Sequence, residues 1–364
     1  MARTASLGDI VEITSSKRIF YSEYTDRGVP FYRSKEIIEK AKGHSRTSTE
    51  LFISETRFNE IKERFGVPEP GDLLLTSVGT LGIPYLVKPG DNFYFKDGNL
   101  TWFRNFKSEI NNRYLIYWLT SDLGKRELEN HTIGSTQKAL TIQGLKKIKI
   151  FLPDIEVQEK IVAIMDGIEE KIELNRRMNE TLEQIGQTIF HKYFSSNEFG
   201  AHKKLGDVLE LHYGKALTAK DREVGLYPVY GSSGVVGYHN KPMIEAPGII
   251  VGRKGNVGSV FWAEDDFYPI DTVFYVTSSL PLSLMYFYLK KAKFINSDAA
   301  VPGLNRTQVY NLDFIYPDKE MVGEVSPLLS YLLMTQRINN QTSKKLTKLR
   351  DSLLPRLISG ELTV

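Results

Sequence analysis

The feature of this sequence that most restricts its fold is an internal repeat. The segment LGDIVE at residues 7–12 matches LGDVLE at residues 205–210, which lies 198 positions further along the chain. Residues 71–87 also resemble residues 247–262, because each is an apolar run, a Gly-rich turn and a second apolar run, as in paired strands. A repeat of this kind decides the architecture of a chain. We therefore expect two similar β-rich domains, each built from one copy.

The two copies also end alike. Leu140, Ile150 and Pro153 align without a gap on Leu304, Phe314 and Pro317, each 164 positions further on. The first copy is thus 34 residues longer inside its globular part. After each proline, apolar residues recur at an average spacing near 3.5, which is typical of a coiled-coil seam. A helix of about 40 residues is roughly 60 Å long, and two such polar helices are best stabilised by burying their seams against each other.

The sequence therefore predicts an α+β chain with two β-rich domains, two long coiled-coil helices and a pseudo-two-fold repeat. The expected ranges are 1–152 and 197–316 for the domains, and 153–196 and 317–360 for the helices. The residues expected to pair the helices are Ile161, Ile168, Asn175, Leu182, Leu332, Asn339 and Leu346. The same stripe includes Ile164, Met178, Ile185, Leu328 and Leu349. Asn175 and Asn339 either face each other and fix the register, or both lie slightly off the seam.

Composition narrows the class of protein. The chain of 364 residues has 41% hydrophobic and 25% charged residues, which is ordinary for globular domains. It contains no cysteine, which excludes disulfides, thiolate metal sites and cysteine nucleophiles and suits a reducing compartment. No run reaches the roughly 18 apolar residues of a membrane span, and the N-terminus lacks an apolar signal core, so we expect a cytoplasmic protein. Basic residues exceed acidic ones by five over residues 1–150, and acidic residues exceed basic ones by five over residues 151–199.

No motif in the sequence indicates catalysis. There is no phosphate-binding GxxxxGK[ST] loop, and the glycines at 252–258 have the wrong spacing for a dinucleotide-binding loop and fit a β-turn better. No Pro-Pro dipeptide occurs, so the Asn/Asp-Pro-Pro-aromatic motif of amino-methyltransferases is missing. The six histidines form no HExxH motif, and the Glu-Glu-Lys at 169–171 lies within a predicted helix. We therefore expect a protein that is not an enzyme, with no metal and no cofactor.

The chain resembles a known family, the specificity (S) subunits of type I restriction–modification systems. The resemblance rests on IKIFLPDIEVQEKIV at residues 148–162, on IEEKIELN at residues 168–175 and on the C-terminal LRDSLLPRLISGEL at residues 349–362. It implies two target-recognition domains that each read one half of a bipartite DNA site, with the two helices antiparallel and acting as a ruler between the halves. It also implies two methyltransferase (M) subunits on the helices and restriction (R) subunits in the full complex. Catalysis, AdoMet, ATP and Mg²⁺ would belong to those partners.

Base reading requires arginine or lysine for guanine and asparagine or glutamine for adenine, on protruding loops. Unequal copies would read unequal half-sites, so we expect an asymmetric target. In the first copy the candidate DNA-binding residues are Tyr32, Arg33, Lys35, Ser77, Thr80, Lys96, Asn99, Gln137 and Lys138. In the second copy they are Tyr230, Ser232, Ser233, Arg253, Lys254, Asn256, Asn305 and Arg306. Each could instead be a solvated turn residue or a phosphate contact.

A second hypothesis needs no DNA. The chain could be a coiled-coil scaffold that holds two other binding domains apart, which its modest net charge of +3 would suit. The two hypotheses differ in one observable, because phosphate neutralisation makes DNA affinity fall steeply with salt. The glutamates of the first helix could serve either solubility or docking of M subunits.

Overall fold

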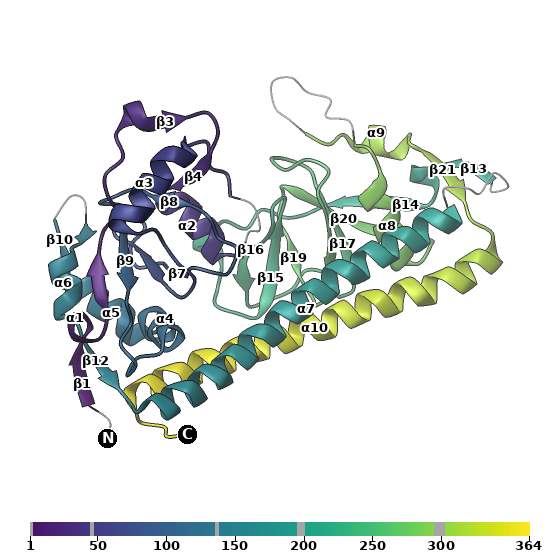
Figure 1. The fold of residues 1–364 in the computed structure, drawn as a ribbon. Coiled ribbons are helices and arrows are strands. Elements are labelled where there is room, and N and C mark those ends of the chain that lie inside the picture. The colour runs from purple at the N-terminus through teal and green to yellow at the C-terminus, as the bar shows by residue number, and fades with distance from the viewer. Residues whose placement is uncertain (1–2, 44–46, 135–137, 195–200, 295–302) are drawn as a thin grey trace. The chain divides into compact units, whose positions relative to one another are not determined.

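The computed structural model describes residues 3–43, 47–134, 138–194, 201–294 and 303–364 (Figure 1). The chain divides into two compact units, which are described separately. One unit comprises residues 1–171 and 345–364, and the other comprises residues 172–344. Each unit therefore contains one globular domain and part of both long helices.

The first domain is built on a four-stranded antiparallel sheet with the order β2-β9-β6-β7. A smaller sheet with the order β3-β5-β4-β8 contains one parallel pair, β4 with β8. The strands are β1 (Arg3–Ser6), β2 (Glu12–Thr14), β3 (Tyr24–Thr25), β4 (Val29–Tyr32), β5 (Phe52–Ile53), β6 (Leu73–Thr76), β7 (Pro84–Leu86), β8 (Tyr94–Phe95), β9 (Leu100–Arg104), β10 (Thr132–Ile133), β11 (Ala139–Leu140) and β12 (Lys149–Leu152). The helices are α1 (Leu7–Ile10), α2 (Ser34–Ala41), α3 (Glu55–Phe65), α4 (Asn112–Thr120), α5 (Asp122–Asn130) and α6 (Ile142–Lys147).

The second domain repeats this plan. Its main antiparallel sheet has the order β14-β20-β17-β18, and a three-stranded sheet, β16-β15-β19, again contains one parallel pair. The strands are β13 (Ala201–Lys204), β14 (Leu209–Tyr213), β15 (Tyr227–Gly231), β16 (Gly234–His239), β17 (Gly248–Gly252), β18 (Val260–Ala263), β19 (Tyr268–Pro269), β20 (Val273–Ser278) and β21 (Asp313–Tyr316). The helices are α8 (Leu282–Lys291) and α9 (Arg306–Tyr310). The shared strand order confirms the predicted duplication.

The two long helices are α7 (Ile155–Phe194) and α10 (Lys319–Ser359). They pair in antiparallel directions in the unit of residues 172–344. The side chain of Asn175 donates to the Oγ of Ser343 at 3.1 Å, whereas that of Asn179 donates to the Oδ1 of Asn340 at 2.7 Å. The partner number falls as the residue number rises, which confirms the predicted antiparallel pair of long helices.

The seam between the helices differs from the predicted one at alternate positions. Ile161, Ile168, Asn175, Leu332 and Asn339 are buried as expected, and Leu182 and Leu346 are half-buried. Ile164, Met178 and Ile185, however, are 38%, 39% and 42% exposed. On α7 the buried or half-buried positions beside them are Met165, Asn179 and Gly186. On α10, Leu328 and Leu349 are likewise exposed, and the less exposed neighbours are Leu329 and Arg350.

The reason for this correction is the order of the steps in the repeat. Steps of four and three residues from Ile161 lead to Met165 and Ile168, whereas steps of three and four lead to Ile164. At each of these positions the prediction took a step of three before a step of four. The helices instead take a step of four before a step of three, which buries or half-buries Met165, Asn179 and Gly186 and leaves several large apolar side chains on the outside.

The two central asparagines also pair differently from the prediction. The Asn175 Nδ2 donates to the backbone oxygen of Asn339 at 3.3 Å, and the Asn339 Nδ2 donates to the Oδ1 of Asn179 at 2.9 Å. Both asparagines are therefore buried on the seam, but their side chains bond to neighbours rather than to each other. A buried polar layer of this kind favours one register at some cost in stability.

Candidate functional site

Four loop segments meet at one edge of the second domain. The turn after β17 contacts the segment before β20, since Arg253 donates from Nη1 to the backbone oxygen of Asp271 at 2.9 Å. It also contacts the segment before α9, because the N–H of Leu304 donates to the oxygen of Arg253 at 2.8 Å. The N–H of Asn256 lies 3.4 Å from the Oγ of Ser232. This edge therefore brings together most of the predicted residues of the second copy: Ser232, Arg253, Lys254, Asn256, Asn305 and Arg306.

An aromatic ring that the sequence prediction missed lies within this cluster. The guanidinium carbons of Arg253 and Arg306 lie 4.9 Å and 5.2 Å from the centre of the Tyr213 ring. Tyr213 is 50% exposed. It ends β14, in which Leu209 and Leu211 face the core, so strict alternation would turn Tyr213 inward as well. Because the strand ends at this residue, alternation gave no signal of its exposure.

Arg306 is held by a second tyrosine. Its Nη2 donates to the hydroxyl of Tyr310 at 3.3 Å, and this hydrogen bond raises the pKa of the Arg306 guanidinium above its ordinary value. The side chain of Asn305, by contrast, caps α9 by accepting a hydrogen bond from the N–H of Thr307 at 2.8 Å. Arg306 is therefore a charged group held in a fixed position. The side-chain oxygen of Asn305 already accepts a hydrogen bond that stabilises α9.

Two predicted residues of the second copy lie inside the domain instead of on a loop surface. Tyr230 packs against Phe261 and Phe267 and is buried, because it lies on the inner face of β15. Ser232 is also buried, and its Oγ lies 3.4 Å from the N–H of Asn256. The expectation that these two side chains protrude is therefore wrong. Ser233, by contrast, is exposed.

In the first domain the predicted residues are distributed differently. Ser77 is only 2% exposed, and its Oγ lies 2.6 Å from the Oγ1 of Thr101, so the expectation of a protruding side chain is wrong here too. The N–H of Ser77 donates to the oxygen of Asn99 at 2.8 Å, which places two candidates side by side. The exposed candidates of this domain are Lys35, Thr80, Lys96 and Lys138. Gln137 lies outside the described residues.

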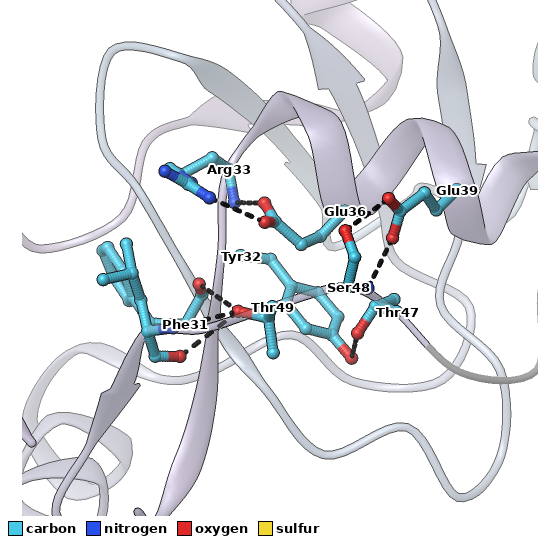
Figure 2. Close-up of polar contacts among 9 residues, drawn as sticks. Phe31, Tyr32, Arg33, Glu36, Glu39, Thr47, Ser48 and Thr49 are labelled. Atoms are coloured by element: carbon cyan, nitrogen blue, oxygen red, sulfur yellow. Dashed lines mark hydrogen bonds and ion pairs between the residues drawn. The ribbon is translucent and has the colours of Figure 1, made fainter. Parts of the chain in front are cut away.

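Tyr32 and Arg33 have structural roles (Figure 2). Tyr32 is buried and stacks on Phe93 with ring centres 4.6 Å apart, because it ends a strand that faces the core. Arg33 precedes α2, and its guanidinium forms a 3.0 Å ion pair with the fully buried carboxylate of Glu36. That carboxylate also accepts the N–H of Arg33 at 2.8 Å. The expectation that these two residues are free to read bases is therefore wrong for Tyr32, and Arg33 already neutralises a buried charge.

The same backbone framework supports both loop edges. In the first copy the N–H of Leu140 donates to the oxygen of Ser77, and in the second the N–H of Leu304 donates to the oxygen of Arg253. Isolated bridges join Val78 to Ala139 and Lys254 to Gly303 in the same way. Ser77 and Arg253 therefore occupy equivalent backbone positions with different side chains.

Among the described residues, no group of three or more histidine, aspartate or glutamate side chains is placed to hold a metal ion. In the same part of the chain, no helix has the length and apolar character needed to cross a membrane.

Comparison with known proteins agrees with this architecture. The family model of the type I restriction modification DNA specificity domain matches twice, over residues 3–184 and 201–348. Among solved structures, the S subunit of the type I restriction–modification system from M. genitalium aligns over 98% of this chain and 96% of that chain. The TM-score is 0.62 at 17% identity, which shows a shared fold. The fold is thus a duplicated DNA specificity domain with two long helices.

The chain belongs to the type I restriction–modification DNA specificity family, since the family model covers most of its length. A type I restriction enzyme specificity subunit of Methanocaldococcus jannaschii, MjaIX, is 25% identical over 81% of this chain and 78% of that protein. A Haemophilus influenzae protein described as a specificity subunit is 30% identical over 171 residues, which are 46% of this chain. That match spans 40% of the Haemophilus protein's own length.

Proposed function

We propose that this chain is the DNA-recognition subunit of a type I restriction–modification complex and that it reads an asymmetric, bipartite target. Each domain would read one half of the target through the loop edge described above. The chain would supply sequence recognition without a catalytic step of its own, and it would act in the cytoplasm. Family membership supports the recognition role, and the duplicated fold supports a target with two halves.

The observation that carries the asymmetry is the exchange of Ser77 for Arg253 on equivalent backbone. The Ser77 hydroxyl is buried against Thr101, whereas Arg253 presents a guanidinium at the loop edge, and bases are distinguished by hydrogen-bonding groups at their edges. Two readers with the same framework and different side chains would therefore recognise different half-sites.

We also propose that the outer faces of the helices dock M subunits and that R subunits join the full complex. In the unit of residues 172–344, large apolar side chains are exposed on both helices. They are Leu174, Met178, Ile185, Leu328, Tyr331, Met334 and Ile338. Exposed apolar groups of this extent are typical of a protein interface. Because the family fold is a repeat, one M subunit on each copy is the expected arrangement.

The experiment that tests the function is mapping methylated adenines in DNA from cells that carry this chain with its M partner. We expect a gapped motif whose two halves differ in sequence, and loss of that motif when this chain is deleted. A continuous or palindromic motif would contradict the proposal. In parallel, affinity of the purified complex for the mapped duplex should fall steeply between low and high salt.

The scaffold hypothesis makes the opposite prediction for the same measurements. It expects no motif that depends on this chain and no salt-dependent affinity for any duplex. Either result, obtained with a complex that assembles normally, would favour the scaffold over DNA recognition.

A further inference from the structure

The two arginines beside Tyr213 lack the carboxylate partners that most arginines in this structure have. Arg57, Arg104, Arg113, Arg337 and Arg350 all form ion pairs with aspartate or glutamate. Within the described part of the chain, neither Arg253 nor Arg306 forms one. Two guanidinium ions on one tyrosine ring repel each other, and a nearby group rich in hydrogen-bond acceptors would offset this repulsion. The cluster is therefore suited to receive such a group from a ligand.

The same contacts fix how the guanidinium groups are presented. A guanidinium that stacks on an aromatic ring is held by its face and donates hydrogen bonds from its edge. Arg253 uses Nη1 to bond to the backbone oxygen of Asp271, and Arg306 uses Nη2 to bond to Tyr310. The remaining nitrogens of Arg253 have no such bond among the described residues, whereas Arg306 also forms a hydrogen bond with Tyr213. A fork oriented in advance in this way binds a pair of acceptors with less loss of side-chain entropy.

We propose that Arg253, held by Tyr213 and supported by Arg306, reads a guanine in the half-site of the second domain. This inference rests on the proposed DNA-recognition function and names one base contact within it. Guanine presents two acceptors, O6 and N7, side by side in the major groove, and these match the edge of a guanidinium. Arg253 is the reader in this arrangement, and Tyr213 and Arg306 are positioning residues.

A comparison of the two copies favours a base over a backbone phosphate. Aligning the repeat places Ser77 opposite Arg253, Ser15 opposite Tyr213 and Ile142 opposite Arg306. All three members of the cluster are thus missing from the first copy, where Ser77 is instead buried against Thr101. Phosphates are identical in both half-sites, so a phosphate contact at this position would be useful to both copies. A base contact is needed only where that base occurs.

The test uses the assembled complex of this chain with its M subunits and the mapped target duplex. Each guanine of the target is replaced in turn by 7-deazaguanine, which lacks the N7 acceptor. For the wild-type complex we expect a loss of affinity on the order of 10- to 100-fold at one guanine, in one half only. Arg253→Met keeps a long side chain but has no hydrogen-bond donor, and Arg253→Ser introduces the residue of the first copy. Both should bind the unmodified target more weakly by a similar factor and should be indifferent to 7-deazaguanine at that position.

Lys254→Ala is the matched control, because Lys254 is the adjacent, exposed cation. We expect it to weaken binding to all duplexes about equally, as a phosphate contact would. Thermal unfolding of each complex checks that the variants are folded, and Arg253→Met serves if the Arg253→Ser variant does not fold. The inference is overturned if Arg253→Met discriminates as the wild type does, if the Arg253 variants lose affinity equally on all duplexes, or if neither half contains guanine. The proposed function fails in a different way, namely when the wild-type complex produces no gapped motif at all.

Discussion

At the scale of single residues, the polar groups near the loop edges divide into those that stabilise a domain and those that remain available to a ligand. Arg33 and Arg253 looked equivalent in the sequence. The structure separates them, because Arg33 neutralises Glu36, whereas Arg253 stacks on Tyr213 without a carboxylate partner among the described residues. Glu36 follows Arg33 by three residues at a helix start, so this pair has some signal in the sequence. Tyr213 lies 40 positions before Arg253, and no motif links the two residues.

The ion pair of Arg33 gives a stability prediction. Arg33→Ala should lower the free energy of unfolding by about 1–3 kcal/mol, because it leaves the buried Glu36 carboxylate without its charged partner. Urea denaturation of the wild type and the variant measures this difference. Adding Glu36→Gln to Arg33→Ala should recover part of the loss, since the amide is neutral. An Arg33→Ala variant as stable as the wild type would show that the pair is not structural.

Glu264 gives a prediction about pH. It accepts a hydrogen bond from the Nδ2 of Asn340 at 2.7 Å, and burial raises its pKa above the ordinary value. A carboxyl whose pKa is higher in the folded state stabilises that state at low pH, and this contribution is lost as the pH rises through the folded pKa. Glu264→Gln should keep the hydrogen bond and flatten the fall in stability between pH 4.5 and pH 7. Denaturant midpoints at the two pH values measure the effect, and an unchanged slope would contradict it.

At the scale of elements, the helices show which part of the fold the sequence could predict. Their existence and approximate length follow from the recurrence of Ile161, Ile168 and Asn175 with period 3.5, whereas their direction followed only from the family resemblance. The alternate seam positions did not follow, because Gly186 and Asn179 are weak hydrophobic signals beside Ile185 and Met178. Periodicity identifies a stripe, whereas the choice between adjacent residues depends on what the opposite surface can accommodate.

Gly186 illustrates this dependence and can be tested. A Cβ atom at Gly186 would lie 2.2 Å from the Cζ of Phe287, which is itself buried in α8. Gly186→Ala should therefore destabilise the second domain, by about 1–3 kcal/mol for overpacking. Gly167 is the matched control on the same helix, since a Cβ there would meet no atom within 4 Å. Gly167→Ala should stabilise the helix by roughly 0.5–1 kcal/mol, and equal effects of the two substitutions in thermal unfolding would contradict this account.

At the scale of the whole molecule, the repeat was the most informative signal. Two copies with one strand order could be predicted because similar segments recur in the same sequence order. The loop edges could not be predicted in detail, since exposure at Tyr213, Ser77 and Tyr230 depends on where strands end and how they face the core. In the second copy, sequence chemistry selected loops that the structure brings together, but it did not show which side chains on them are exposed.

If the helices set the gap between the half-sites, their length should determine the number of unread base pairs. Inserting one heptad into α7 and one into α10, at matched seam positions, adds seven residues or roughly 10 Å to each helix. That length corresponds to about three base pairs at roughly 3.4 Å per pair. Mapping of methylated adenines should then show the same two half-sites with a longer gap. An unchanged gap in a complex that still methylates would show that the helices do not measure it.

The shared hydrogen bonds beneath Ser77 and Arg253 have a consequence for how such proteins change over time. Because the same main-chain bonds form beneath a serine in one copy and an arginine in the other, the side chain at this position can be exchanged without rebuilding the sheet. New target preferences would then arise by single substitutions in one copy, while the other copy and the helices keep the complex assembled.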